Sequence, residues 1–133
     1  TQNHFGSNPV FVLTSKVTFS AGEQLAHALK VRNRAVLVGE KTDGGAHPGV
    51  SYRLHPHFEV FIPIGRVINP TTGSNWEKTG VEPDVPVPPA QAFDTAYCMA
   101  LESIIEHMGK PSTREDIALL DEVRKIFEDY KKI

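Results

Sequence analysis

The sequence has little of several features that mark particular classes of protein. Its 133 residues hold one cysteine, Cys98, which excludes an internal disulfide and a zinc site built from cysteines. The formal net charge is −2, and no stretch is dense in lysine and arginine as in nucleic-acid-binding proteins. Its longest apolar runs fall far short of the ~20 residues that cross a membrane. We therefore expect neither a nucleic-acid partner nor a membrane span.

Two further patterns are missing. Residues 1–9 lack the charged and apolar regions of a secretory signal. The six histidines do not form a metal-binding pattern, because His55 and His57 flank Pro56 in an expected turn and no carboxylate has the spacing of a third ligand. We expect no bound metal.

What is present is the composition of one folded domain, with 40% hydrophobic and 23% charged residues. Short apolar runs at Pro9–Thr14 and Ala35–Gly39 predict buried strands, and the helical spacing of Ser20–Arg32 lies between them. This order predicts a right-handed β-α-β unit and an α/β fold class. The helix is expected to pack through three residues on one side, Leu25, Ala26 and Leu29.

The rest of the chain predicts a β-hairpin and two helices. Val50–Leu54 and Phe58–Ile64 alternate apolar and polar residues around a turn, with Phe58, Val60, Ile62 and Ile64 on one face. Val85–Pro88 is a short edge strand at most, because proline cannot donate to a strand ladder.

The closing helices are expected over Ala90–Met108, with Phe93 on its apolar stripe, and from a capping box of Ser112 and Glu115 to about Tyr130. We therefore divide the chain into residues 1–89, and a helical hairpin at residues 90–133 that packs on or follows that part.

Ser20 is the first candidate for chemistry. It stands where a buried strand turns into a helix, and a helix start offers unpaired N–H groups and a partial positive charge to an oxyanion. The amide of Ala21 would be one such donor. The pattern Ser20-x-x-Glu23 is equally a capping box with a purely structural role, and the residues around it leave both interpretations open.

Two loops are the other candidates. Residues 39–48 contain the adjacent glycines Gly44 and Gly45, which permit close backbone approach to a ligand but equally suit a flexible connector. Residues 65–80 are too long for an irregular stretch without function. The candidate itself is residues 75–84, which combine the only tryptophan with three acids, Glu77 among them, although an acid in a loop is usually just solvated.

Five stretches, taken together and in this order, resemble the tail-specific (C-terminal processing) serine proteases, peptidase family S41. The similarity is greatest to the branch with the tricorn core and the interphotoreceptor retinoid-binding proteins, and it runs from Pro9 to about Ala96. The stretches are Pro-Val-Phe-Val-Leu-Thr-Ser, Thr-Phe-Ser-Ala-Gly-Glu, Val-Gly-Glu-Lys-Thr-Asp-Gly-Gly-Ala-His-Pro, Ile-Asn-Pro-Thr-Thr-Gly-Ser-Asn-Trp-Glu and Gly-Val-Glu-Pro-Asp-Val.

The resemblance implies that Ser20 is a nucleophile, that the Ala21 amide is an oxyanion donor and that Gly44 and Gly45 border the substrate. The lysine that classical members use as base is absent, since Gly45 stands at its position. The tricorn-like branch uses a histidine supported by a glutamate, and Glu77 fits that glutamate. The base histidine lies upstream of the serine in that branch, where this chain has only His4, which does not match; His47 is a possible local substitute.

The implied function is that of a serine endopeptidase without a cofactor, acting on peptides or proteins. The implied fold is a crotonase-like (ClpP-like) α/β spiral lacking its N-terminal part. Residues 1–89 would then be the C-terminal portion of a protease domain, catalytically incomplete without the missing portion. The resemblance also implies a periplasmic or extracellular setting, and a homo-oligomer is possible. The alternative is a non-catalytic module that binds apolar ligands or peptides, with Phe58, Val60 and Ile62 lining the site.

Overall fold

The computed structural model describes residues 6, 8–109 and 111–131. Its centre is a parallel sheet in the order β1-β2-β5, formed by β1 (Phe11–Thr14), β2 (Val36–Gly39) and β5 (Val85–Pro86). Helix α1 (Ala21–Val31) connects β1 to β2. This is the predicted β-α-β unit, and the α/β class is confirmed.

The central strand β2 divides the core into two layers. Leu37 and Val38 are both fully buried, and because neighbouring strand residues point to opposite faces they enter different clusters. Leu37 packs with Ala26 of α1 on one face, whereas Val38 packs with Ala92 and Ala96 of the long helix α2 (Pro89–Met108) on the other. The sheet therefore lies between α1 and α2.

Two expectations about apolar faces are wrong. Leu25 is 58% exposed. The buried residues of α1 are Glu23 and Ala26, which are three positions apart and therefore lie on one side of the helix, and Leu25 lies outside that side. Phe93 is also 58% exposed and stacks on Tyr97 at the helix surface rather than entering the core.

The C-terminal part is a helical hairpin of α2 (Pro89–Met108) and α3 (Arg114–Tyr130). Its own core contains Leu101, Val123 and Phe127. The predicted cap of the second helix is displaced by one residue: the side chain of Thr113, not Ser112, accepts a hydrogen bond from the Asp116 amide at 3.1 Å.

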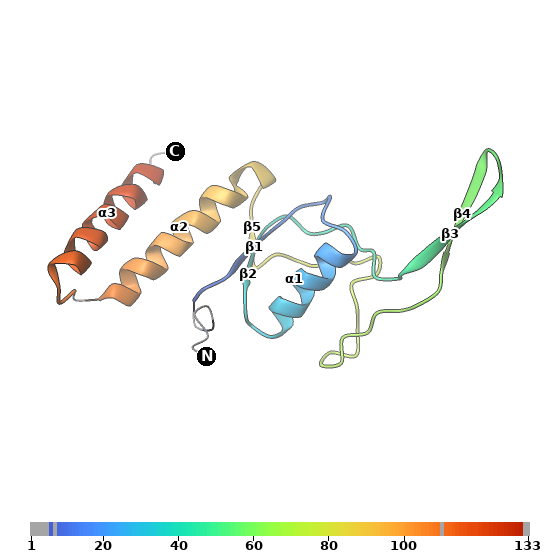
Figure 1. Ribbon diagram of the computed structural model, residues 1–133, viewed down its shortest axis with the longest axis horizontal. Helices are drawn as coiled ribbons and strands as arrows, with labels where there is room; N and C mark the ends of the chain where they lie inside the picture. Colours follow the sequence, from blue (N-terminus) through green and yellow to red (C-terminus); the bar gives the residue numbers. More distant parts are fainter. Residues whose placement is uncertain (1–5, 7, 110, 132–133) are drawn as a thin grey trace.

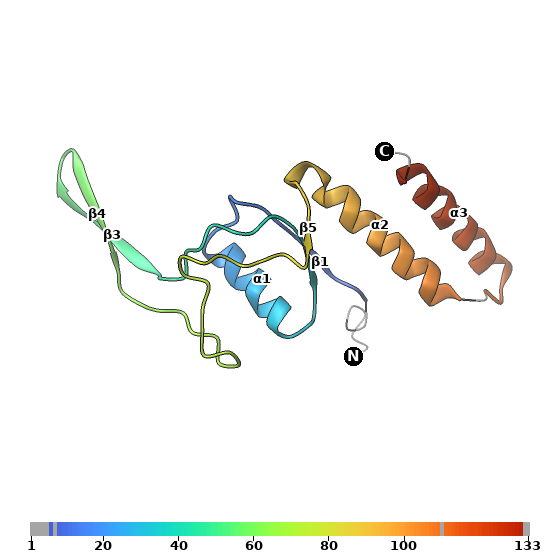
Figure 2. The same cartoon turned by 180° about the vertical axis from the view of Figure 1, so that it is seen from behind.

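Strands β3 (Gly49–His55) and β4 (Phe58–Pro63) form the predicted antiparallel hairpin as a separate two-stranded sheet. It projects from the body at the end opposite α2 and α3 (Figures 1 and 2). Its predicted apolar face is not core, since Phe58 is 69% and Ile64 66% exposed. No helix of the described residues is long and apolar enough to cross a membrane.

Candidate active site

Ser20 occupies a strained backbone position between β1 and α1. It is the N-cap of α1 with φ 53° and ψ −113°, a region that side-chain-bearing residues rarely adopt. Such a conformation costs about 1–3 kcal/mol and persists only where the surroundings enforce it. The Ser20 side chain is exposed at a strand-to-helix turn, which is the backbone setting in which nucleophilic serines are presented.

The first turn of α1 leaves one backbone amide beside Ser20 without a hydrogen-bond partner among the described residues. The amide of Gly22 donates to Phe19 O and that of Gln24 to Ser20 O, whereas the Ala21 amide has no hydrogen-bond partner in the described part of the chain. A free N–H at a helix N-terminus lies at the positive end of the helix dipole, where a negative charge is stabilised. Ala21 therefore lies where the sequence places an oxyanion donor.

Glu23 is a site residue that the sequence shows only as a helix cap. Its side chain is fully buried and its carboxylate accepts four hydrogen bonds, from the Ser20 amide (2.9 Å), the Thr42 hydroxyl (2.6 Å), the Gly44 amide (2.7 Å) and the Gly45 amide (2.8 Å). Hydrogen bonds to charged groups contribute about 1.5–3 kcal/mol each, enough together to offset the burial of a carboxylate. Three of the four donors lie about 20 residues away, so no local pattern predicts them.

Gly44 and Gly45 use their backbone groups inside the protein. Both amides donate to Glu23, while the Gly44 carbonyl accepts from the Lys78 amide (2.8 Å) and the Gly45 carbonyl from the Trp76 indole (3.0 Å). A Cβ at Gly45 would overlap the Phe19 ring. That ring therefore occupies the space in which the lysine of classical members would begin, and substrate binding by these glycines stays a prediction.

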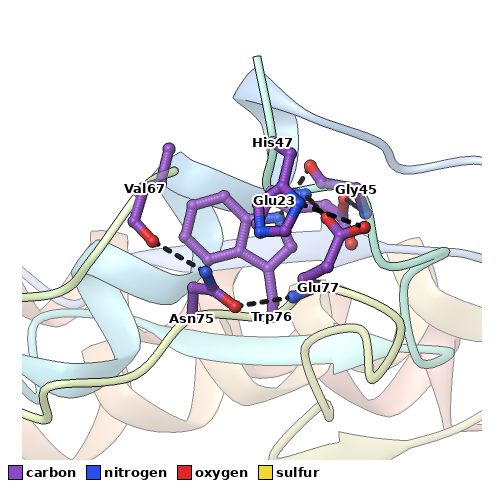
Figure 3. Close-up of polar contacts among 8 residues, drawn as sticks. Glu23, Gly45, His47, Val67, Asn75, Trp76 and Glu77 are labelled. Atoms are coloured by element: carbon purple, nitrogen blue, oxygen red, sulfur yellow. Dashed lines mark hydrogen bonds and ion pairs between the residues drawn. The ribbon is translucent and has the colours of Figure 1, made fainter. Parts of the chain in front are cut away.

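Glu77 contacts the same loop, beside His47 (Figure 3). One of its oxygens accepts from the Ala46 amide at 2.7 Å, and the other is 3.7 Å from Nδ1 of His47. Its own amide donates to Asn75 Oδ1 at 3.1 Å, and the neighbouring Trp76 is buried. The structure thus brings together the predicted carboxylate and the candidate local histidine.

The serine and the histidine are joined only through the loop. The carboxylate of Glu23 connects Ser20 to Gly45, and Gly45 is two residues from His47. Among the described residues, no imidazole nitrogen is hydrogen-bonded to the Ser20 hydroxyl. His4 lies outside the described residues. The described residues hold no group of three metal-ligating side chains, and His55 and His57 contact one another at the hairpin tip.

A large cavity lies away from these residues. It is a groove of about 1010 Å³ at the C-terminal half of α1, and neither Ser20, His47 nor Glu77 lines it. Its lining includes His27, whose pKa is lowered by burial, and the ion pair of Lys30 with Asp84 at 2.7 Å. Burial raises the pKa of Asp84, but the Leu37 amide and Lys30 outweigh it and hold that pKa below its usual value. This groove is separate from the candidate active site.

Comparison with known proteins finds one family. Residues 2–87 match the model described as Peptidase family S41. The chain is 35% identical over 97 residues to the carboxyl-terminal-processing peptidase 2, chloroplastic, of Arabidopsis thaliana, covering 72% of this chain and 19% of that protein. It is also 35% identical over 83 residues to the chloroplastic C-terminal processing peptidase of Tetradesmus obliquus, covering 62% of this chain and 18% of that protein.

Solved structures give the same result. The photosystem II D1 C-terminal processing protease matches with a TM-score of 0.52 and 35% identity, over 62% of this chain and 21% of that one. Mature CPAF in complex with lactacystin matches with a TM-score of 0.54 over 72% of this chain and 19% of that one; at 21% identity it shows similarity of fold. The chain spans about a fifth of the length of the relatives it matches.

Proposed function

The chain belongs to peptidase family S41, and from this premise we propose that it supplies the nucleophile, Ser20, to a C-terminal processing serine endopeptidase. The observation that carries the proposal is the strained, exposed backbone position of Ser20 at the start of α1. A serine that served only as a helix cap would have no need of a positive φ, since caps normally adopt an extended backbone.

The proposed reaction is acyl transfer. The Ser20 hydroxyl oxygen attacks the carbonyl carbon of a peptide bond while a histidine accepts the hydroxyl proton. The Ala21 amide donates a hydrogen bond to the oxyanion that forms. Collapse of this intermediate breaks the C–N bond, and the leaving amine takes the proton from the histidine. Water then hydrolyses the acyl ester and restores the serine.

We propose that the general base is a histidine outside this chain and that Glu77 orients it. The Ser20 hydroxyl has no imidazole partner among the described residues, and the family resemblance assigns the base to an upstream segment. The chain alone would then be catalytically incomplete. His47 is the rival base, favoured by its approach of 3.7 Å to Glu77.

Labelling with a fluorophosphonate probe tests both parts of the proposal. We expect Ser20-dependent labelling of the full-length protein that Ser20→Ala abolishes, and at most weak labelling of the 133-residue chain. Strong labelling of the chain alone that disappears in His47→Gln would make His47 the base. A full-length protein whose labelling and peptide hydrolysis survive Ser20→Ala would contradict the assignment of the nucleophile.

The alternative function, binding of an apolar ligand, has less support. Of the hairpin residues expected to line such a site, Phe58 and Ile62 are exposed and Val60 is half-buried, and none of the three lines either of the two cavities beside α1. For the compartment, the two curated relatives are chloroplastic by name, whereas the resemblance favours a periplasmic or extracellular protein. Fractionation of the source cells would decide between these settings.

A further inference from the structure

Glu23 makes more contacts than a helix cap requires. In a capping box the glutamate side chain needs to accept only from the N-cap amide, here that of Ser20, which it does at 2.9 Å. The other three hydrogen bonds go to Thr42, Gly44 and Gly45, in the loop that follows β2. The carboxylate therefore joins two segments that are separate in the sequence.

Each of the two carboxylate oxygens of Glu23 accepts two of the four hydrogen bonds. Oε2 accepts from both Ser20 N and Gly45 N, so these two amides are held on one atom. Oε1 accepts from the Thr42 hydroxyl and Gly44 N and thereby fixes the preceding part of the loop. All four partners donate, and a carboxylate is the side chain that accepts on both of its ends.

The loop then continues directly to the catalytic candidates. Ala46, the next residue, donates its amide to Glu77 at 2.7 Å, and His47 follows at 3.7 Å from the other Glu77 oxygen. The Trp76 indole holds the Gly45 carbonyl at 3.0 Å. Movement of Gly45 would consequently displace Glu77 relative to Ser20.

Resting on the proposed function, we propose that Glu23 is a positioning residue that fixes the strained Ser20 relative to Glu77 through the backbone of residues 44–46. It touches no substrate and transfers no proton. Its effect is on geometry, and a misplacement of about 1 Å in an active site can cost on the order of 100-fold in rate.

Glu23→Gln tests this proposal with little change of shape. The amide NH₂ of glutamine replaces one accepting oxygen, so it would face two donors that it cannot bond. In the full-length protein we expect kcat to fall on the order of 100-fold with KM within about threefold, because the geometry of the reacting groups changes and substrate contacts do not. Glu23→Asp, which keeps both accepting oxygens, should restore part of kcat.

The matched control is Glu115→Gln, an exposed acid in the first turn of α3 that has no contact with the site. It should leave kcat unchanged. Circular dichroism at the assay temperature must show Glu23→Gln folded. If Glu23→Gln is only partly folded, its kcat is calculated per folded molecule, and the kcat of Glu23→Asp is compared as well. A folded Glu23→Gln with the kcat of the unchanged protein would overturn the proposal.

A second measurement does not depend on activity. Amide hydrogen exchange at Gly44 and Gly45 should accelerate more than tenfold in Glu23→Gln, whereas the interior amides of α1 should stay protected. Unchanged exchange at both glycines overturns the positioning role even if the protein cleaves no peptide. Activity lost in Ser20→Ala but retained in Glu23→Gln would leave the proposed function intact and reject Glu23 alone.

Discussion

At the scale of single residues, backbone conformation distinguishes Ser20 from Asn33, another residue with a positive φ. Of the described residues other than glycine, Ser20, Asn33 and Lys78 have positive φ. Asn33 directly follows the C-cap of α1, where asparagine often adopts the left-handed conformation. Serine is not favoured in this conformation, and the Ser20 amide donates to the buried carboxylate of Glu23.

His27 gives a prediction about pH. Burial lowers its pKa in the folded protein, so its stabilising contribution is complete above the unfolded pKa of 6.5 and is lost as the pH falls from there through the folded pKa. We expect His27→Gln to reduce the loss of unfolding free energy between pH 7.5 and pH 5. Urea denaturation at both pH values measures this, with the exposed His57→Gln as control. An unchanged pH dependence in His27→Gln would contradict the prediction.

At the scale of elements, the helix ends show how local chemistry sets boundaries. Gly109 has a φ of 51° and ends α2, as the sequence predicts for a glycine before a proline. The start of α3 is less obvious, because Ser112 and Thr113 are both good caps with an acid three residues later. Thr113 has the extended backbone, φ −111° and ψ 160°, that directs its oxygen to the Asp116 amide.

The two candidate caps of α3 can be separated by mutation. Thr113→Ala should lower the unfolding free energy by about 1 kcal/mol, since it removes the acceptor for the Asp116 amide. Ser112→Ala should leave the unfolding free energy nearly unchanged. Chemical denaturation followed by circular dichroism compares them, and a larger effect at Ser112 would restore the cap expected from the sequence.

At the scale of the whole molecule, the central strand β2 connects the parallel sheet with α1 and α2. Its two faces meet α1 and α2, its edges pair with β1 and β5, and its carboxyl end leads into the loop held by Glu23. Ser20 lies past the carboxyl end of β1, at the same edge of the sheet, because the strands are parallel. The candidate site is therefore positioned by the sheet, while the projecting hairpin and the helical hairpin extend from opposite ends (Figure 1).

Two leucine-to-alanine substitutions, one in the core and one at the surface, test which side of α1 and β2 is buried. Leu37→Ala should lower the unfolding free energy by about 2–5 kcal/mol, because it leaves a cavity between the sheet and α1. Leu25→Ala should change it by no more than about 0.5 kcal/mol, because that side chain is exposed. Equal losses, measured by urea denaturation, would show that the sequence-based assignment of Leu25 to the core face was right.

The sequence by itself determined the α/β class, the order of the elements and the family, because apolar periodicity, turn residues and short motifs are local features. It also named Ser20, Glu77 and His47, whose places in the chain were enough to make them candidates.

Only the tertiary structure decided which side of α1 is buried, that the hairpin stands apart from the core, and that Glu23 binds the loop of residues 42–45. These outcomes depend on contacts between segments that are separate in the sequence. No local pattern encodes such contacts, because packing and the need to satisfy a buried carboxylate select them only once the chain has folded.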